Sequence, residues 1–394
     1  MRIVNAAVIG TGFIGPAHVE ALRRTPGVNV LAIGSNEPDR AREVAGRFGI
    51  PRVYDSWQAV IRDADVEVVH NCTPNNLHFT INKAAIEAGK HIVSEKPLTM
   101  TSKESAALLA LLKKRPLVNA VNFNYRMYPL IQHARAMATR GDLGPVHLIH
   151  GHYIQDWLLY DTDYNWRLEP EFGGVSRAVA DIGSHWCDLV QFVSGRTIVE
   201  VMADLMTVHP KRKKPAGVVD TFKGKEAKAA PKGISVPVET EDAGIIMFRL
   251  DNGGRGVVTV SQVSAGRKNR EWFEIDGGTA AVAWDQEEPN SLWIGHRDRA
   301  NETLLKDPSL LDESARRYAH YPGGHPEGYP DGPKNLFTNV YAAVRSREKA
   351  GKKAPDFPTF ADGHRENLIV DAVMASNRQR RWVRVNHSPE TRGV

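Results

Sequence analysis

The stretch VSEKPLT at 93–99 places a lysine between a carboxylate and a proline, directly after an apolar run. Pro97 has a fixed φ angle and no N–H donor, so the turn that carries Lys96 is rigid. Glu95 can pair with neighbouring polar groups and orient the lysine. An amine in poorly solvated surroundings has a lowered pKa and can transfer protons near neutral pH. Lys96 is therefore either an acid–base residue or a surface lysine at a strand end.

A second candidate pair, Asp181 and His185, stands in the helix-like segment 173–195. Residues four apart lie on one face of a helix. Such a pair could contribute two ligands to a metal, although two ligands alone make a poor site, and we expect no metal. It could also form a structural hydrogen bond in the core, or face a substrate as an acid–base pair. Spacing alone does not separate these alternatives.

A glycine-rich loop, GTGFIG, follows the first apolar run and precedes the first helical pattern. A dinucleotide-binding loop requires this context, because the helix N-terminus then offers N–H groups and a partial positive charge to a pyrophosphate. The first glycine permits the tight turn, the second lets the ligand approach the backbone, and the third allows close helix–strand packing. The alternative is a glycine turn that only packs. The predicted cofactor contacts are Gly10, Gly12, Phe13, Ile14 and Gly15.

The adenosine end of the cofactor is less clearly specified. An acidic residue about 20 positions beyond the glycine loop usually binds the ribose 2′-hydroxyl of NAD. Ser35 occupies that place here, although Glu37 lies close to it. Ser35 and Arg40 could instead surround a 2′-phosphate, with Asn36 beside them. The cofactor is therefore predicted as NAD or NADP, with the balance towards NADP.

Apolar runs and helical patterns alternate through residues 1–126. Strands that are apolar nearly throughout, each followed by a crossover helix, indicate a parallel sheet covered on both faces. We therefore predict a doubly wound α/β dinucleotide-binding domain, whose ligands lie beyond the carboxyl ends of the strands. Its strands are expected at 3–10, 28–34, 66–73, 91–96 and 117–126, and its helices at 13–25, 38–49, 77–89 and 101–114.

The pattern changes after residue 129. A helix near 129–140 precedes alternating strands separated by Gly, Asn and Asp turns, which indicate a large open, mostly antiparallel sheet backed by helices. We predict an α+β substrate-binding and oligomerisation domain at 127–385 and a flexible tail at 386–394. Its strands are expected at 146–157, 197–208, 243–250, 254–264, 270–277, 279–284 and 291–295, with closing helices at 336–351 and 360–378.

The composition excludes several classes of protein. The chain of 394 residues is 42% hydrophobic and 25% charged, with a formal charge of +5, which suits a two-domain globular protein. Two cysteines cannot form a disulfide framework, and no window has the roughly 18 apolar residues of a membrane span. The basic segment 209–237, with KRKK at 211–214, is expected to be a solvated loop, since only Phe222 could serve as a base reader. We expect a cytoplasmic protein that binds neither membrane nor nucleic acid.

Three motifs in this order resemble those of the glucose–fructose oxidoreductase/inositol dehydrogenase/MocA family. They are GTGFIG followed by His18, EKP at 95–97 and D-x-x-x-H at 181–185, and the likeness covers almost the whole chain. The resemblance implies that Lys96, Asp181 and His185 form the catalytic set. In the family, the histidine is the general acid/base on the reacting oxygen, the lysine polarises or protonates that oxygen, and the aspartate orients substrate and histidine. The family's lysine–proline bond is often cis.

The resemblance extends to residues with less specific signals. It implies cofactor or substrate contacts at or just beyond the ends of three strands of the first domain: Thr73, Pro74, Asn75, His78, Glu95, Asn124, Tyr125 and Arg126. A polar–aromatic cluster suits a polyol ring, with ordinary packing as the alternative: His152, Asp156, Trp157, Trp166 and Arg167. His325 and Tyr329, in the Gly/Pro-rich stretch 321–333, are expected to cap the pocket.

These features predict an NAD(P)-dependent dehydrogenase or reductase that transfers a hydride between nicotinamide and a secondary alcohol or ketone of a sugar, anhydrosugar or cyclitol. One alternative is a glycosidase that retains NAD and oxidises its substrate transiently. Another is a non-catalytic sensor of sugar or dinucleotide, which would have lost the lysine or the histidine. The open sheet would expose a broad apolar face, so we expect a homodimer or homotetramer formed through it. The sugar, the carbon oxidised and the physiological direction are left open.

Overall fold

The computed structural model describes residues 1–216, 233–346 and 355–387. Tertiary contacts divide the chain into two units. The first unit comprises Met1–Asn124 and Pro330–Asn367, and the second comprises Tyr125–Tyr329 and Leu368–Val394. The return of 330–367 to the first unit was not foreseen from the sequence. The separate roles of the two domains stay predictions, as does the flexible tail, of which 388–394 lie outside the described residues.

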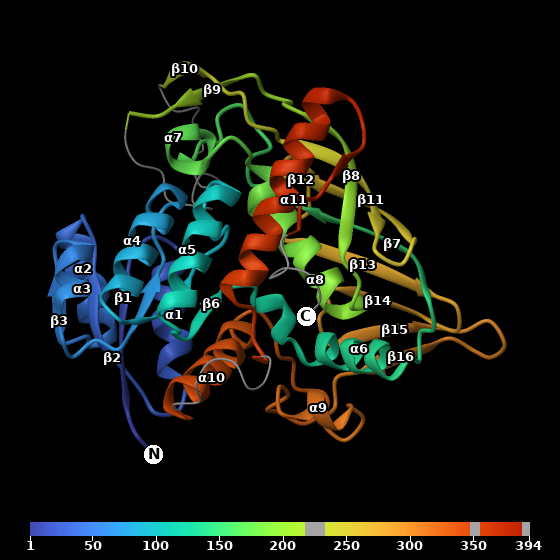
Figure 1. Cartoon of the computed structure of the whole chain (residues 1–394), viewed down its shortest axis with the longest axis horizontal. Helices are drawn as coiled ribbons and strands as arrows, with labels where there is room; N and C mark the ends of the chain where they lie inside the picture. The colour runs from blue at the N-terminus through green and yellow to red at the C-terminus, as the bar shows by residue number, and fades with distance from the viewer. Residues whose placement is uncertain (217–232, 347–354, 388–394) are drawn as a thin grey trace. The chain divides into compact units, whose positions relative to one another are not determined.

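A six-stranded parallel sheet forms the centre of the first unit (Figure 1). Its strand order is β3-β2-β1-β4-β5-β6, so the chain starts in the middle and winds outward in both directions. The winding direction reverses between β1 and β4, which is where ligands of such sheets bind. The strands are β1 (Val4–Ile9), β2 (Val28–Gly34), β3 (Arg52–Tyr54), β4 (Val68–Asn71), β5 (His91–Ser94) and β6 (Asn119–Val121).

Helices cover both faces of this sheet because its strands are apolar on both sides. One face, which includes Val69 and Ile92, packs in a single core with side chains of α3, α4 and α5. On the other face α1 packs against α10. The helices are α1 (Ile14–Arg23), α2 (Pro38–Phe48), α3 (Trp57–Arg62), α4 (Asn75–Glu87), α5 (Ser102–Lys114), α10 (Asp331–Ser346) and the first part of α11 (Phe360–Gln379).

Two strands of the first unit end earlier than predicted. Strand β5 ends at Ser94, so Glu95 and Lys96 lie in the following turn. Strand β6 stops at Val121, and a 3₁₀ turn follows at Asn124–Met127. Strand β3 and helix α3 were not predicted, because their 3 and 6 residues are too few for a periodic signal.

A nine-stranded sheet forms the centre of the second unit, in the order β16-β15-β14-β13-β7-β12-β11-β8-β17. Neighbouring strands are antiparallel except β12 and β7, which run parallel. The strands are β7 (Val146–Ile154), β8 (Ile198–Met206), β11 (Ala243–Leu250), β12 (Arg255–Ser261), β13 (Arg270–Gly277), β14 (Ala281–Asp285), β15 (Ser291–Gly295), β16 (Glu302–Leu305) and β17 (Val383–Arg384). The fold class predicted from the sequence is confirmed in both units.

Helices cover one face of the larger sheet, as Figure 1 shows for α8. Helix α8 packs on β7 and β13, and α6 packs on β15. The core between them contains Trp186, Phe248 and Phe273, each almost fully buried. The helical segments of this unit are α6 (Pro129–Arg140), α7 (Pro170–Gly173), the π-helical turn Val179–Gly183, α8 (Ser184–Ser194), α9 (Glu313–Arg316) and the end of α11.

The basic run KRKK is not the solvated loop that the sequence suggested. It forms strand β9 (Lys211–Lys214), which pairs with β10 (Ile234–Pro237). Arg212 is 1% exposed, and its guanidinium donates to the carbonyl oxygens of Leu158, Tyr160 and Asp163 and to the Asp242 carboxylate. The run therefore anchors the chain that follows Trp157. Residues 217–232 of the basic segment lie outside the described residues.

Both cysteines, Cys72 and Cys187, are buried and free. Among the helices that the structure describes, none combines the length and the hydrophobicity needed to cross a membrane.

Candidate functional site

The glycine loop between β1 and α1 has the geometry of a dinucleotide-binding loop. Gly10 has a φ of 108°, and a Cβ there would overlap the carbonyl group of Cys72. A Cβ on Gly15 would overlap the carbonyl of Gly10, so only glycine lets helix and strand approach this closely. A Cβ on Gly12 would meet no atom within 4 Å, so this backbone faces open space that a pyrophosphate can enter. Phe13, which is 51% exposed, precedes the first helical residue, Ile14.

The loop after β2 carries a cation and an anion where the adenosine ribose is predicted. The buried Ser35 hydroxyl lies 3.1 Å from the Thr11 hydroxyl and accepts a hydrogen bond from the Glu37 N–H. Ser35 thereby holds this loop against the glycine loop. Arg40 Nη1 lies 3.8 Å from Glu37 Oε2, and Asn36 is exposed.

The turn after β5 places Lys96 next to a buried carboxylate. The Lys96–Pro97 peptide bond is cis. Glu95 is 6% exposed; its Oε1 lies 2.9 Å from His18 Nε2 and accepts a hydrogen bond from Asn122 Nδ2, and its Oε2 accepts from the Lys96 N–H. Burial alone would raise the pKa of Glu95. The His18 hydrogen bond, the positive charges of His18 and Lys96, and the Asn122 hydrogen bond outweigh burial and lower the pKa to about 2.

A chain of buried rings extends from Glu95 across the face of the first sheet. The Nδ1 atoms of His18 and His70 lie 3.0 Å apart, so one donates and the other accepts. His70 Nε2 lies 2.9 Å from the Tyr341 hydroxyl. Burial and the positive charge of His18 hold the pKa of His70 well below its usual value, so His70 is neutral. With His70 neutral, each of the three hydrogen bonds from Glu95 through His18 and His70 to Tyr341 can have one proton, so every ring nitrogen in the series has a partner.

The N-terminal end of α4 lies at the same edge of the sheet. Pro74 precedes the helix, whose first residue is the buried Asn75. His78 on this helix links two loops, because its ring nitrogens lie 2.7 Å from the Pro97 carbonyl oxygen and 2.9 Å from that of Thr73. Burial lowers the pKa of His78, so a single N–H serves one of the two carbonyls at neutral pH. A direct cofactor contact by His78 stays a prediction.

An unsatisfied donor supports a ligand at this edge. Asn124 follows β6 and is 2% exposed, and its Nδ2 atom has no hydrogen-bond partner among the described residues. A buried amide without a partner is costly, and a bound polar group would satisfy it. Together with the open backbone at Gly12, this donor shows that the first unit fits a dinucleotide.

Asp181 of the second unit is held by a buried network. The helix predicted over 173–195 begins with a π-helical turn at Val179–Gly183, and Asp181 lies within it. Gln262 Nε2 donates to Asp181 Oδ2 over 2.9 Å, and Gln262 Oε1 accepts from Arg177 Nη1, also over 2.9 Å. Arg177 and Arg212 both contact the fully buried carboxylate of Asp242. The aspartate is thus oriented through an amide whose other end is fixed by a buried ion cluster.

His185, in the first turn of α8, is packed among tyrosine rings. It is 7% exposed, and its ring meets the Tyr125 ring edge-on with centroids 5.0 Å apart. The Tyr125 and Tyr153 hydroxyls lie 2.9 Å apart, and Asn269 binds both of them. Tyr329 lies against Tyr125, with ring centroids 6.4 Å apart. These contacts fix the ring plane of His185, which a general acid/base requires.

Glu271 lies opposite Tyr153 in the sheet and is fully buried. Neither of its carboxylate oxygens has a hydrogen-bond partner among the described residues. Burial, and then the negative charge of Asp188, raise the pKa of Glu271 well above its usual range, which favours the neutral acid.

The predicted polar–aromatic cluster forms only in part. The Arg167 guanidinium lies 4.4 Å from the Trp166 ring and 6.0 Å from the Trp157 ring, and its Nε lies 3.5 Å from Asp181 Oδ1. The structure therefore brings these three residues and Asp181 together. His152 is not among them: it follows the strand alternation onto the opposite face of the sheet from Tyr153 and stacks on Trp272. Asp156 is ion-paired with Lys268.

Two other predicted substrate residues have structural partners. Arg126 forms a buried bidentate ion pair with Asp188, so its charge is already neutralised. The stretch around His325 is anchored by the buried Lys306 ammonium, which donates to the carbonyl oxygens of Tyr321 and His325 and to the Glu327 carboxylate. The His325 side chain itself is exposed. Substrate contacts by Arg126 and His325 stay predictions.

Sequence reasoning missed the residues that orient the candidate groups. His70 stands in the short strand β4 and Asn122 directly follows the short strand β6, where polar residues resemble ordinary loop boundaries, and Tyr341 lies 271 residues from its partner His70. Gln262 and Arg177 had no local signal either. The only available signal was polarity at the ends of strands that are otherwise apolar, such as Asn122 and Asn124.

Comparison with known proteins identifies the family. Residues 4–123 match the oxidoreductase family with an NAD-binding Rossmann fold, and residues 131–283 match the GFO/IDH/MocA C-terminal domain. The chain belongs to the GFO/IDH/MocA oxidoreductases. The family and the oxidoreductase activity predicted from the sequence are thus confirmed, as is an NAD-binding domain.

Several relatives are similar over long stretches. Levoglucosan dehydrogenase of Pseudarthrobacter phenanthrenivorans is 32% identical over 98% of this chain and 99% of its own length. Myo-inositol 2-dehydrogenase of Thermotoga maritima is 28% identical over 56% of this chain and 63% of its own length. A solved structure of levoglucosan dehydrogenase with NADH and levoglucosan has a TM-score of 0.86 and 30% identity, covering 98% of this chain and 99% of that one.

We expect the stability of the first unit to depend on the charge of Glu95. A carboxylate whose folded pKa is about 2 and whose ordinary pKa is 4.5 stabilises the fold above that ordinary pKa, and this stabilisation is lost as the pH falls through the window between them. Below pH 4.5, the unfolding free energy of the wild type should fall more steeply than that of Glu95→Gln, by up to about 1.4 kcal/mol per pH unit. Urea titrations between pH 3.5 and 6 measure both slopes.

The exposed carboxylate of Glu43 offers a matched control. Glu43→Gln should keep the wild-type slope. Equal slopes in wild type and Glu95→Gln would show that the buried carboxylate has an ordinary pKa, and the proposed pairing with His18 would be wrong.

Proposed function

We propose that this oxidoreductase is an NAD(P)-dependent dehydrogenase or reductase of a sugar, anhydrosugar or cyclitol, and that Lys96, Asp181 and His185 act on the same substrate. The observation that carries the proposal is the full-length similarity to levoglucosan dehydrogenase. The rigid Lys96 turn and the oriented Asp181–His185 pair add to it. An anhydrosugar related to levoglucosan is therefore the first substrate to test.

The geometry of each unit supports a division of roles. When bound, the nicotinamide supplies the carbon that accepts or donates the hydride. Lys96 follows the carboxylate of Glu95 in a turn at the ligand-binding edge of the first sheet, where an ammonium can polarise the substrate oxygen. His185 is held by tyrosine rings and can take or return the hydroxyl proton at one ring nitrogen. Asp181 is directed by Gln262 and can orient the substrate hydroxyl and the histidine.

The two alternative functions receive less support. The relatives named above are dehydrogenases, and neither is a glycosidase or a regulator. A sensor without chemistry would not need the lysine and histidine that this chain retains. Net accumulation of NADH or NADPH with a free sugar, followed at 340 nm, would distinguish a dehydrogenase from a glycosidase that only oxidises its substrate transiently. The cytoplasmic location stays a prediction.

Replacement of the proposed catalytic groups should abolish turnover without loss of cofactor. Lys96→Ala and His185→Ala should each lower kcat by about 10²–10⁴-fold, the usual contribution of a positioned acid or base. Quenching of protein fluorescence by NADH should show cofactor affinity within a few-fold of wild type. Lys83→Ala, at a half-exposed surface lysine of the same unit, is the matched control. Near wild-type kcat in both variants, on a substrate found in the sugar screen, would refute the assignment.

We further propose that Glu37 and Arg40 set the choice between NAD and NADP. The balance towards NADP rests on the absence of an acid at Ser35, whose hydroxyl is used within the loop. The solved structure of levoglucosan dehydrogenase named above contains NADH, and the preference of this chain between the two cofactors is open to test. Glu37 would repel a 2′-phosphate and bind a ribose hydroxyl, whereas Arg40 would attract the phosphate.

Opposite changes are expected from the two side chains. Arg40→Ala should raise the KM for NADP at least several-fold and leave the KM for NAD nearly unchanged. Glu37→Gln should raise the KM for NAD and lower that for NADP. Steady-state kinetics with both cofactors measure the ratio of kcat/KM. A ratio that neither substitution moves would show that the two residues do not contact the adenosine ribose.

The open face of the larger sheet is the proposed surface for a homo-oligomer. Its outward side chains include Leu148 of β7, which is 40% exposed, and Ile245 and Met247 of β11, which are 54% and 43% exposed. Strand β12 lies between these two strands. Their partners across these strands include Met202 and Val257. A large exposed apolar patch of this kind marks an interaction surface, and a second subunit is the partner that we propose for it.

A charge in the middle of this face should prevent assembly. Met247→Glu should shift the mass measured by light scattering from an oligomer towards the monomer, because an unpaired carboxylate would be buried in the interface. Lys103→Glu, on an exposed position of α5, is the control and should leave the mass unchanged. A wild-type monomer, or an unchanged mass in Met247→Glu, would rule out this surface.

A further inference from the structure

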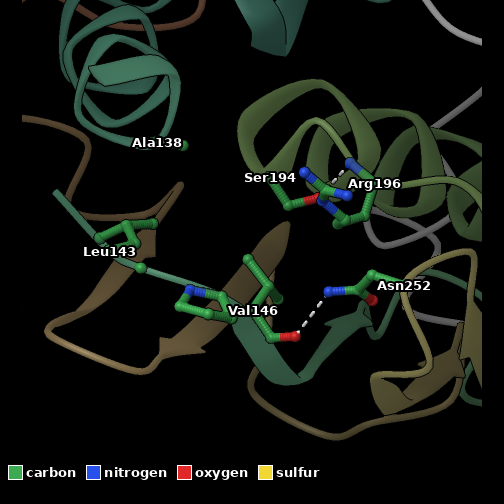
Figure 2. A pocket seen from close by; sticks show the side chains of 8 residues that line it. Ala138, Leu143, Val146, Ser194, Arg196 and Asn252 are labelled. Carbon is green, nitrogen blue, oxygen red and sulfur yellow. Dashed lines mark hydrogen bonds between the residues drawn. The ribbon is translucent and has the colours of Figure 1, made fainter. Parts of the chain in front are cut away.

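A pocket of about 210 Å³ lies within the second unit, at the opposite end of helix α8 from His185 (Figure 2). It is formed where the end of α6, the start of β7, the end of α8 and the turn between β11 and β12 meet. Ala138, Leu143 and Val146 form its apolar wall, and Ser194, Arg196 and Asn252 its polar wall. Nothing in the proposed reaction uses these residues.

Two of the polar residues already have partners within the chain. Asn252 Nδ2 donates to the carbonyl oxygen of Val146 over 2.9 Å, as Figure 2 shows. Ser194 Oγ donates to the carbonyl oxygen of Val190 and accepts from the Arg196 N–H. The Arg196 guanidinium, by contrast, has neither a hydrogen bond nor an ion pair with any residue that the structure describes. Arg196 is therefore a positive charge in the pocket that no described residue neutralises.

A second arginine, Arg135 of α6, does not line the pocket but lies beside Gly195, between two of its lining residues. Arg135 Nη1 lies within 2.8 Å of where a Cβ on Gly195 would stand, and Gly195 separates the two pocket residues Ser194 and Arg196. The half-buried Arg135 guanidinium lies 5.5 Å from the Phe192 ring, and it has no ion pair with any described residue. Burial, and then the positive charges of Arg126 and Arg196, lower the pKa of Arg135.

Three carboxylates of the adjoining elements are engaged with other arginines, whereas Asp251, next to Asn252, is exposed and forms no ion pair with a described residue. Asp188 pairs with Arg126, Asp142 with Arg140, and Glu200 with Arg249. The C-terminal end of α8, at Ser194, contributes a partial negative charge of only about half an electron. Two whole positive charges, one of them half-buried beside Phe192, therefore exceed the combined negative charge of this helix end and of the Asp251 carboxylate.

We propose that this pocket binds a phosphate group through Arg135 and Arg196. Paired guanidiniums suit the oxygens of phosphate because each can donate two parallel N–H bonds. The volume of about 210 Å³ is below the roughly 300–1,000 Å³ typical of sites for larger ligands, so a small ligand fits best. Free phosphate and a small phosphorylated metabolite share this chemistry.

Thermal unfolding of the whole chain in chloride buffer at constant ionic strength tests the site. Inorganic phosphate should raise the Tm of the wild type with saturation. Arg135→Gln and Arg196→Gln should each weaken the apparent affinity at least tenfold. Arg140→Gln is the matched control, since this arginine of α6 is paired with Asp142 and Asp312. A Tm rise of equal size in all four proteins would place phosphate elsewhere and overturn the proposal.

The phosphate-free proteins provide a second readout. Arg196→Gln should leave the Tm unchanged or raise it, because it removes an unpaired charge. A lower Tm would show that the guanidinium already has a partner in the free protein, which contradicts the proposal.

Crystals soaked in arsenate, the heavier analogue of phosphate, should show an anomalous peak between the two guanidiniums, and its absence would also refute the site. Glucose 6-phosphate in place of phosphate distinguishes the two sources. Tighter binding of the ester indicates a phosphorylated metabolite, and tighter binding of phosphate indicates the free ion. None of these readouts depends on hydride transfer, so their failure would leave the proposed enzyme activity unaffected.

Discussion

An ionised carboxylate in the interior of the first unit requires its neighbours to stay in place. Glu95 is 6% exposed, and a buried charge is tolerated only where hydrogen bonds and an opposite charge compensate for the lost water. His18 from α1 and Asn122 from the end of β6 provide these contacts. Because both partners come from other elements, the turn that carries Lys96 cannot move without exposing or abandoning the carboxylate.

The same requirement explains why a distant helix belongs to this unit. His18 needs a partner for its second ring nitrogen, His70 provides it, and His70 in turn needs the hydroxyl of Tyr341 on α10. The aromatic ring of Phe337, also on α10, packs against both histidines. The chain therefore returns at Pro330–Asn367 to close a core that its first 124 residues leave incomplete.

In the second unit, too, partners from distant parts of the chain hold a buried charged group in place. Asp181 is directed by Gln262, and Gln262 is directed by Arg177, whose charge meets Asp242 in the interior. Arg212 completes the cluster and at the same time anchors the chain after Trp157. A basic run that resembles a solvated surface thus supports the candidate active-site helix. In both units, buried ionic contacts fix part of the surroundings of a candidate catalytic residue: the backbone of Lys96 in the first unit and the carboxylate of Asp181, through Gln262, in the second. Fixed positions of this kind lower the entropy cost of reaching a reactive geometry.

Local sequence was sufficient for the features that depend on short-range chemistry. Alternating apolar runs and helices predicted the first sheet, and Gly10, Gly12 and Gly15 have the three conformational roles that their spacing implies. Lys96 and the Asp181–His185 pair were selected as candidates from a proline and a helical repeat within a few residues of them, and their catalytic roles, which the family resemblance implies, stay predictions. The predicted ends of β5 and β6 were wrong, since strand ends depend on hydrogen bonds to neighbouring strands rather than on local composition.

Long-range contacts were decided only by the tertiary structure. Whether Arg212 is solvated or buried depends on a carboxylate 30 residues away and on carbonyls that precede it by about 50 residues. His152 was grouped with Trp157 by proximity in sequence, but strand alternation placed it on the other face of the sheet. The composition of a segment determines which element it can form. The partners of a charged side chain depend on where the rest of the chain brings its opposite charge.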